Sequence, residues 1–429
     1  MRAMKDSGIE WIGEIPESWS LCRIKRVAEI ITGNTPSKAS DNLNYSEDGI
    51  MWIKPDNLMG TIPIQETIEH LSEEGTKLAR VVPSKTPLIC CIGTVGKVGY
   101  AEEEASFNQQ INAICFDNTI DTRFGLYCLI AQEEQQKCFA NGNVLKILNA
   151  ETQGNLFIAI PPLDEQMNIS KYLDTKCAEI DALIAAKEKT NTLLKERRQS
   201  IIYEAVTKGL DPTVPMKDSG VEWIGEIPEG WEIAALKRLG IPATGSTPSK
   251  DSADYWDGDI PWVSSKDMKS DYILDSEDHI TQAAVDECGL TLFPPGTLIF
   301  CVRSGILRHT FPVAVATLPV TINQDLRALS LTGDVNPAFL LYYMRGMNDT
   351  VVTLYQKIGA TVESIEMDWF LYFPVVLPAR EEQDRIVEAL DSRCASLDQT
   401  VKQNEATIRQ LKEYRQSVIY EAVTGKIEV

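Results

Sequence analysis

Two stretches of the chain keep a helical pattern of apolar and polar positions over 43 residues each. Residues 165–207 align without a gap on residues 382–424, and neither stretch contains a proline or a glycine. Each follows a proline-containing lead, which suits the start of a helix. At a rise of 1.5 Å per residue, the pattern predicts two helices that are each about 64 Å long.

Both predicted helices carry a seam at every seventh position, apolar except at one place in each. Such a stripe requires a partner helix, so we predict that the two helices pack antiparallel as a coiled coil. The polar interruptions, Lys187 and its counterpart Asn404, would fix the register at some cost in stability. The alternative is that each helix lies on a globular core. The seam positions are Leu173, Ile180, Lys187, Leu194 and Ile201 in the first helix and Leu390, Leu397, Asn404, Leu411 and Val418 in the second.

The helices belong to a longer internal repeat. "MKDSGIEWIGEIPESW" at residues 4–19 returns as "MKDSGVEWIGEIPEGW" at residues 216–231, and the register continues 212 positions apart through "TGNTPSK" and "TGSTPSK". Later blocks, such as "NQQINAI" and "NQDLRAL", follow with small shifts that place insertions in loops. The repeat predicts two similar units that each end in one long helix. We interpret the tryptophans of the two openings as core anchors, namely Trp11, Trp19, Trp223 and Trp231.

Between its opening and its helix, each unit mixes short β-rich runs with turn signals. Runs such as "TPLICCIG" and "GTLIFCV" predict strands, and residues 123–139 and 337–347 predict helices. The fold class is therefore α+β, with two similar domains joined by two long antiparallel helices and related by a pseudo two-fold axis. The linker "KGLDPTVP" allows the chain to reverse after the first helix. The predicted boundaries are 1–160 and 211–377 for the domains and 161–210 and 378–429 for the spacer helices.

Composition narrows the class of protein. The 429 residues suffice for two or three domains, and no apolar run is long enough for a membrane span or a secretory signal, so we expect a cytoplasmic protein. The 10 cysteines form no C-x-x-C motif and the 3 histidines are scattered, so we expect reduced thiols and no metal site.

The net charge of −21 argues against a protein that binds nucleic acid. Residues 211–377 alone carry −12, whereas residues 161–210 are neutral. Net charge, however, describes long-range fields and solubility, and a locally basic groove can exist on an acidic protein.

No catalytic motif is present, so we predict no catalytic residue. "GTVGKVG" at residues 93–99 has the wrong spacing for a phosphate-binding loop of the Walker type and has no match in the second unit. The chain also lacks G-x-G-x-x-G, H-E-x-x-H and G-x-S-x-G. These absences favour a binding protein over an enzyme.

Polar side chains at turns recur in both units and are our candidates for binding DNA. Lys, Arg, Asn, Gln, Ser and Thr are the residues that bond phosphates and base edges. For any one of them the alternative is structural, since a Thr-Pro-Ser turn caps itself and Asn108 or Gln109 can satisfy buried backbone groups. The candidates are Thr35, Ser37, Lys38, Lys54, Lys97, Asn108 and Gln109 in the first unit and Thr247, Ser249, Lys250, Ser265, Lys266, Arg303, Arg308, Asn323 and Gln324 in the second.

The arrangement resembles the specificity subunit of type I restriction-modification systems. The resemblance covers nearly the whole chain and rests on a set of motifs that occurs twice in the same order. They are the "WIGEIPE" openings, "TG-TPSK", the "NQ" block, the "PPLDEQ" and "PAREEQ" leads, and "RQS-IYEAVT" at the end of each helix. The resemblance implies two target-recognition domains separated by two antiparallel spacer helices.

The resemblance also implies a function and partners. Each domain would read one half of a bipartite DNA sequence, and we expect two different half-sites because the domains differ at "KPDNLMG" and "SSKDMKS". Two methyltransferase subunits and two restriction subunits would join the chain, and the methyltransferase would flip and methylate an adenine at N6. S-adenosylmethionine, ATP and Mg²⁺ would bind those partners, and no cofactor would bind this chain. Two alternatives are a duplicated protein-interaction scaffold that does not bind DNA, and a standalone nuclease or methyltransferase.

Overall fold

The computed structural model describes residues 2–37, 43–142, 145–357 and 362–429. It divides into two compact units, one of residues 1–188 together with 405–429 and one of residues 189–404. We call these the first unit and the second unit. Within the described residues, no helix combines the length and the apolar character needed to cross a membrane.

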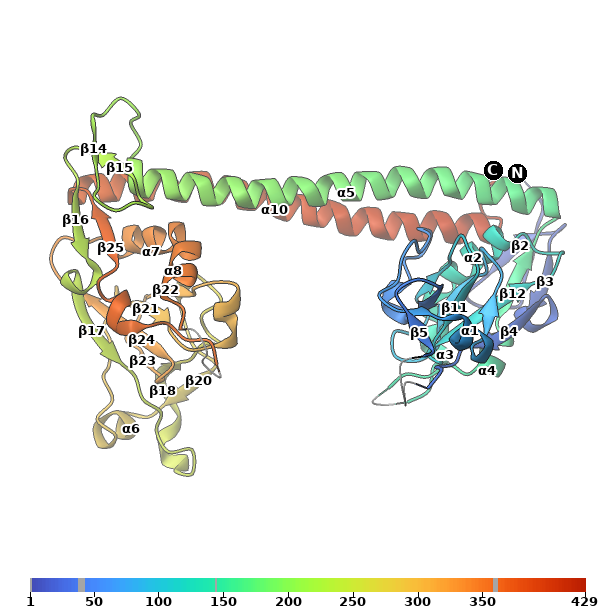
Figure 1. The fold of residues 1–429 in the computed structure, drawn as a ribbon, viewed down its shortest axis with the longest axis horizontal. Coiled ribbons are helices and arrows are strands. Elements are labelled where there is room, and N and C mark those ends of the chain that lie inside the picture. Colours follow the sequence, from blue (N-terminus) through green and yellow to red (C-terminus); the bar gives the residue numbers. More distant parts are fainter. Residues whose placement is uncertain (1, 38–42, 143–144, 358–361) are drawn as a thin grey trace. The chain divides into compact units, whose positions relative to one another are not determined.

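The first unit combines small β-sheets with short helices (Figure 1). Its opening repeat forms the hairpin of β1 (Met4–Asp6) and β2 (Glu14–Pro16), and β3 (Ser20–Arg23) pairs with β13 (Phe157–Ile160). A four-stranded sheet has the order β10 (Val98–Gly99), β9 (Leu88–Cys90), β12 (Ile111–Phe116) and β4 (Ala28–Thr32). A five-stranded sheet has the order β5 (Tyr45–Ser46), β7 (His70–Leu71), β6 (Ile50–Ile53), β11 (Ala105–Phe107) and β8 (Val81–Val82). The helices are α1 (Glu73–Leu78), α2 (Thr122–Ala131), α3 (Glu133–Phe139) and α4 (Ala150–Gly154).

The second unit follows the same plan. The hairpin is formed by β14 (Met216–Asp218) and β15 (Glu226–Pro228), and β16 (Glu232–Ala235) pairs with β25 (Pro374–Leu377). A five-stranded sheet has the order β17 (Gly240–Thr244), β24 (Leu326–Leu331), β21 (Leu298–Cys301), β22 (Val313–Ala316) and β19 (Tyr272–Ile273). A three-stranded sheet has the order β20 (Asp278–Ile280), β18 (Trp256–Val263) and β23 (Thr321–Ile322). The helices are α6 (Gln282–Glu287), α7 (Pro337–Gly346), α8 (Asn348–Tyr355) and α9 (Met367–Phe370).

Two long helices, α5 (Leu163–Lys208) and α10 (Arg380–Val423), contribute to both units (Figure 1). In the first unit Asp181 Oδ1 lies 3.1 Å from Arg415 Nε. In the second unit Arg198 Nε lies 3.3 Å from Asp398 Oδ1, and Asn404 Nδ2 donates a hydrogen bond of 2.8 Å to Asn191 Oδ1. Partners advance along α5 as they recede along α10, so within each unit the helices run antiparallel. The predicted α+β fold class and the antiparallel helices are thereby confirmed.

Burial along the seam follows the predicted heptads. Leu173, Ile180, Leu390, Asn404 and Val418 are buried. The remaining seam positions, Lys187, Leu194, Ile201, Leu397 and Leu411, are partly buried. The polar contact joins Asn404 to Asn191, which lies outside the seam predicted for the first helix.

Each hydrophobic core uses the start of one long helix and the end of the other. The first core contains Leu173 near the start of α5 and Ile419 near the end of α10. The second contains Leu390 near the start of α10 and Ile202 near the end of α5. Residues 405–429 therefore belong to the first unit, whereas our sequence-based boundaries treat each spacer helix as a separate segment.

The repeated openings are fastened to these helix ends by matching hydrogen bonds. Trp19 Nε1 donates to Glu165 Oε2 at 3.2 Å, and Trp231 Nε1 donates to Glu382 Oε2 at 3.1 Å. Tyr420 Oη donates to Trp11 O at 2.9 Å, and Tyr203 Oη donates to Trp223 O at 3.1 Å. Trp19 and Trp231 are buried, while Trp11 and Trp223 are partly buried against the cores. All four tryptophans therefore anchor the openings to their units.

Candidate nucleic-acid interface

A polar loop at the edge of each unit is built on a close approach of two backbone segments. In the first unit the "TGNTPSK" loop follows β4, and Gly33 N donates to Ile111 O at 2.9 Å while Asn34 N donates to Phe107 O at 3.1 Å. A Cβ on Gly33 would overlap Asn108 O and Phe107 O, and a Cβ on Gly245 would overlap Ile322 O in the second unit. Glycine is therefore required in "TG" because no side chain fits between the loop and the neighbouring turn.

The same loop is joined to the "NQ" turn by a hydrogen bond that occurs in both units. Thr35 Oγ1 donates to Gln109 Oε1 in the first unit. Thr247 Oγ1 donates to Gln324 Oε1 at 2.5 Å in the second. These four side chains are exposed or partly exposed, so they remain accessible to a ligand. The structure thus brings together two of the blocks that the sequence marked separately.

In each unit a tryptophan side chain bonds the stretch that contains it, the third repeated block, to the TPSK loop. Trp52 Nε1 donates to Asn34 O at 3.4 Å, and Trp262 Nε1 donates to Ser246 O at 3.0 Å. The polar stretches "KPDN" and "SSKD" follow these tryptophans directly. Each unit therefore holds the TPSK loop, the NQ turn and the post-tryptophan turn in one cluster, which we call the reading cluster.

Several candidates in the reading cluster are engaged inside the protein. Asn108 and Asn323 are 6% and 7% exposed, and their Oδ1 atoms accept hydrogen bonds of 3.1 Å from Gln110 N and Asp325 N. Lys97 Nζ donates to Pro55 O at 3.0 Å, and Lys54 Nζ pairs with Glu69. These contacts match the structural alternative, because they order the turns that present their neighbours.

Other candidates project from the second unit with carboxylates beside them. Arg303 Nε lies 3.2 Å from Asp325 Oδ1, and Arg308 pairs with Glu363. The hydrogen bond from Arg308 holds the pKa of Glu363 below its usual value. Both arginines are more than half exposed, so the carboxylates orient them without burying them.

The remaining candidates are held mainly through their backbone. Lys266 Nζ lies 4.0 Å from Glu277 Oε2, and Ser265 is partly exposed. Ser249 O accepts a hydrogen bond of 3.0 Å from Trp256 Nε1, and Lys250 is exposed beside it. Ser37 O accepts a bond of 2.8 Å from Asn44 Nδ2. Lys38 lies outside the described residues.

In each unit an arginine that we did not predict from the sequence donates a hydrogen bond to the threonine of "TG". Arg327 Nη1 donates to Thr244 Oγ1 at 2.8 Å, and Arg80 Nη1 donates to Thr32 O. Burial lowers the pKa of Arg327. Arg80 follows α1 whereas Arg327 lies in β24, so the two contacts arise at different points of the repeat and the alignment gives no signal for them.

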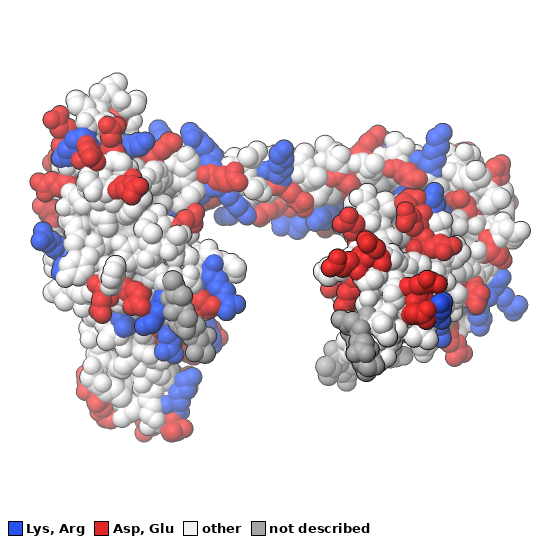
Figure 2. Space-filling model, viewed as in Figure 1, with Lys and Arg blue, Asp and Glu red and all other residues white. Residues whose placement is uncertain are grey.

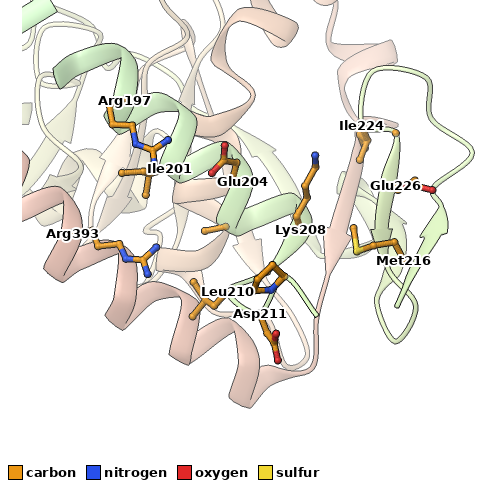
Figure 3. A pocket seen from close by; sticks show the side chains of 14 residues that line it. Arg197, Ile201, Glu204, Lys208, Leu210, Asp211, Met216, Ile224, Glu226 and Arg393 are labelled. Carbon is orange, nitrogen blue, oxygen red and sulfur yellow. The ribbon is translucent and has the colours of Figure 1, made fainter. Parts of the chain in front are cut away.

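A hollow of about 820 Å³ in the second unit shares no lining residue with the reading cluster. It lies where α5 ends, the linker begins and the β14–β15 hairpin returns (Figure 3). Lys208, Arg197 and Arg393 line it together with Asp211 and Glu226. The mixed charges of this lining give no preference for a polyanion.

Comparison with known proteins identifies the repeated unit. A family model described as the type I restriction modification DNA specificity domain matches residues 16–194 and again residues 228–412. The chain belongs to this family. Its two specificity domains correspond to the two copies of the internal repeat, and each match extends from the opening hairpin into a long helix.

Relatives and solved structures agree with the family. The specificity subunit of the type I restriction enzyme EcoR124I/EcoR124II from Escherichia coli is 32% identical over 182 residues, which cover 42% of this chain and 43% of that relative. The chain therefore matches less than half of that protein. The putative type I restriction enzyme MjaX specificity subunit of Methanocaldococcus jannaschii is 24% identical, with 97% of this chain and 96% of that one covered. A solved structure from work on complex assembly and conformational transition of the type I R-M system has a similar fold, with a TM-score of 0.74, 16% identity, and coverage of 96% and 99%.

Proposed function

We propose that this chain is the DNA sequence-specificity subunit of a type I restriction-modification enzyme. Each specificity domain reads one half of a bipartite, asymmetric DNA target. The chain itself carries out no bond-making step. Methylation of an adenine at N6 and DNA cleavage belong to partner subunits, which hold S-adenosylmethionine, ATP and Mg²⁺.

The observation that carries this proposal is the duplicated reading cluster. The hydrogen bonds from Thr35 to Gln109 and from Thr247 to Gln324 keep the same framework in both units. Around that framework the side chains differ, because Lys54 and Asp56 of the first unit align with Ser264 and Lys266 of the second. A constant frame that presents different donors and acceptors suits two readers of two different sequences.

The long helices suit a spacer and a scaffold. A helix of 46 residues, such as α5, is about 69 Å long at 1.5 Å per residue. We propose that the helix pair sets the number of unread base pairs between the half-sites, as half-site spacing follows protein geometry in other DNA-binding proteins. Two methyltransferase and two restriction subunits complete the assembly on this scaffold.

Methylome sequencing of cells with and without the chain tests the proposal. We expect one bipartite motif with methylated adenine in both halves, and we expect its methylation to disappear when the chain is deleted. Restoring the gene on a plasmid is the control and should restore the same motif. An unchanged methylome on deletion would contradict the proposal.

The acidic composition favours one competing function, a protein-interaction scaffold that does not bind DNA. The second unit contains all of residues 211–377, which carry a net charge of −12. A mobility-shift titration on duplex DNA, with and without the methyltransferase subunits, separates the two. A reader binds its motif more tightly with the partner present and more weakly as salt rises, whereas a scaffold gives no shift at any salt concentration.

A further inference from the structure

A basic hollow of about 560 Å³ lies in the second unit beside the reading cluster. Its walls are the turn after β18, the segment before β22, the junction of α7 with α8, and α5. Four cationic side chains and no carboxylate belong to its described lining, and the four are Arg198, Lys266, Lys269 and Arg345. This concentration is unusual in an acidic chain. In Figure 2 most of the charged side chains on the visible face of the first unit are acidic, whereas the second shows a group of Lys and Arg side chains among acidic ones.

The walls of the hollow are fixed by hydrogen bonds that need no ligand. Gln199 Nε2 on α5 donates to Arg345 O at 2.8 Å and to Gly346 O at 3.2 Å, which ties α5 to the end of α7. Asn348 Oδ1 accepts from Phe311 N at 2.7 Å and from Thr310 Oγ1 at 3.0 Å, which ties α8 to the segment before β22. The elements that carry Arg198 and Arg345 are therefore held together before any ligand arrives.

Each of the two guanidinium groups pairs with a carboxylate but keeps an Nε atom without a hydrogen bond to any residue that the structure describes. Arg345 pairs with Asp271, yet its Nε atom is buried and has no hydrogen-bond partner among the described residues. Arg198 Nε lies 3.3 Å from Asp398 Oδ1 but likewise makes no hydrogen bond there. Burial, and then repulsion from Arg198, lowers the pKa of Arg345 to about 10. An anion in the hollow would offset this repulsion.

The lysines lie at the mouth of the hollow. Lys269 is exposed and has no ion-pair partner within the part of the chain that the structure describes, and Lys266 Nζ lies 4.0 Å from a carboxylate. Both follow Trp262, whose indole bonds to the TPSK loop. The hollow is thus continuous with the reading cluster.

We infer that this hollow binds a phosphate of the DNA backbone next to the half-site read by the second unit. The inference rests on the proposed function and adds a contact that positions the DNA and reads no base. Continuity with the reading cluster favours DNA over an acidic protein segment, because a duplex lying on the cluster would bring its backbone to the mouth of the hollow.

The first unit does not offer the same contact. The positions aligned with Lys266, Lys269 and Arg345 are Asp56, Met59 and Ile130. The position aligned with Arg198 is Arg415, whose Nη2 donates to Thr61 Oγ1 at 2.7 Å. Arg123 Nη2 also donates to Thr61 O at 3.2 Å. Two arginines therefore meet at Thr61, whereas the second unit has two arginines and two lysines, so we expect an asymmetric phosphate contact.

The test uses the assembled chain and methyltransferase on a duplex that carries the methylome-defined motif. In the variant Lys269→Gln, the slope of log binding constant against log salt should become shallower by about 1, because one phosphate contact contributes about 0.9. Base preferences should not change, because phosphate contacts are sequence-independent. The matched control Lys85→Gln removes one exposed first-unit lysine and should leave the slope unchanged.

A scan with methylphosphonate, a neutral phosphate substitute, locates the contact. In the wild type, neutralising one phosphate beside the half-site read by the second unit should weaken binding, and Lys269→Gln should lose that sensitivity. An unchanged slope with intact specific binding would overturn the inference and leave the proposed function in place. Weaker capture of the methyltransferase with an unchanged slope would instead assign the hollow to an acidic protein surface. Absence of specific binding by the wild type would count against the proposed function itself.

Discussion

The two units share a framework to the level of single hydrogen bonds and differ in the chemistry that surrounds it. The Trp-to-Glu bond of the opening, the Tyr-to-backbone bond at the helix end and the Thr-to-Gln bond of the loop all occur twice. The turn after the tryptophan differs in charge between the two units. The end of α2 in the first unit also differs in charge from the end of α7 in the second. The comparison teaches that the repeat conserves what assembles a unit and varies what the unit presents.

We expect the largest effect from substitutions at the ends of α5 and α10, where each helix enters the core of one unit. Ile419 and the aligned Ile202 are fully buried, in the first and second core respectively. Either change to alanine should lower the free energy of unfolding by about 2–5 kcal/mol, because it removes buried methyl groups and leaves a cavity. Hydrogen exchange read by mass spectrometry should show Ile419→Ala loosening the first unit and Ile202→Ala loosening the second. Loosening of the opposite unit would break the shared-core description.

The loop glycines give the next largest effect. In Gly33→Ala or Gly245→Ala the new Cβ overlaps the backbone of the neighbouring turn, so overpacking should cost about 1–3 kcal/mol and displace the reading cluster. Each variant should degrade recognition of one half of the methylation motif, and a different half in each case. Gly230→Ser serves as the control, since nothing lies near that position and the first copy has Ser18 there. Equal loss in both halves would contradict independent readers.

The helix pair differs between the units in a way that can be measured. The first unit packs Ile180, Ile184 and Ile408 together, whereas the second contains the buried bond between Asn404 and Asn191. Asn404→Leu alone should cost about 1–3 kcal/mol because it strands a buried amide, while the double change with Asn191→Leu should recover most of that loss. A double-mutant cycle by urea unfolding measures the coupling. Additive effects would show that the two amides do not depend on each other.

A surface ion pair of the same helices should give the smallest effect. Lys412 Nζ lies 3.8 Å from Glu188 Oε1, and both side chains are more than half exposed. Lys412→Gln should change the free energy of unfolding by less than about 1 kcal/mol, because solvent screens such pairs and ordering two long side chains costs entropy. Thermal unfolding at low and high salt provides the measurement, and a loss above 2 kcal/mol would show that the pair is more than a surface contact.

Much of the fold was predictable because the sequence contains a heptad pattern and an internal repeat. The seam from Leu173 to Ile201 indicates a helix with a partner, and the ungapped repeat indicates two units of one plan. The boundaries of the compact units were less accessible, because no local pattern shows that Ile419 belongs to the same core as Trp19, 400 positions earlier in the sequence.

The reading cluster was only partly predictable. "TG-TPSK" and "NQ" were identified as separate turns, and their contact through Gly33 and Gly245 depends on sheet pairing that the sequence does not state. Arg345 was missed because it lies in a helix that reads as core, and its cationic neighbours Arg198 and Lys269 are distant in sequence. When a cluster is formed by residues that are far apart in the sequence, they form no motif of fixed spacing by which the cluster could be predicted.

The sharing of helix ends also bears on synthesis at the ribosome. Residues 189–404 supply the whole second unit, so all of its residues are translated before residues 405–429, which the first unit also needs. The first unit must wait for Val418 to Val423, which lie in its core. The part of the protein that is translated first is therefore finished last, and until then its exposed apolar surface depends on chaperones or assembly partners for protection.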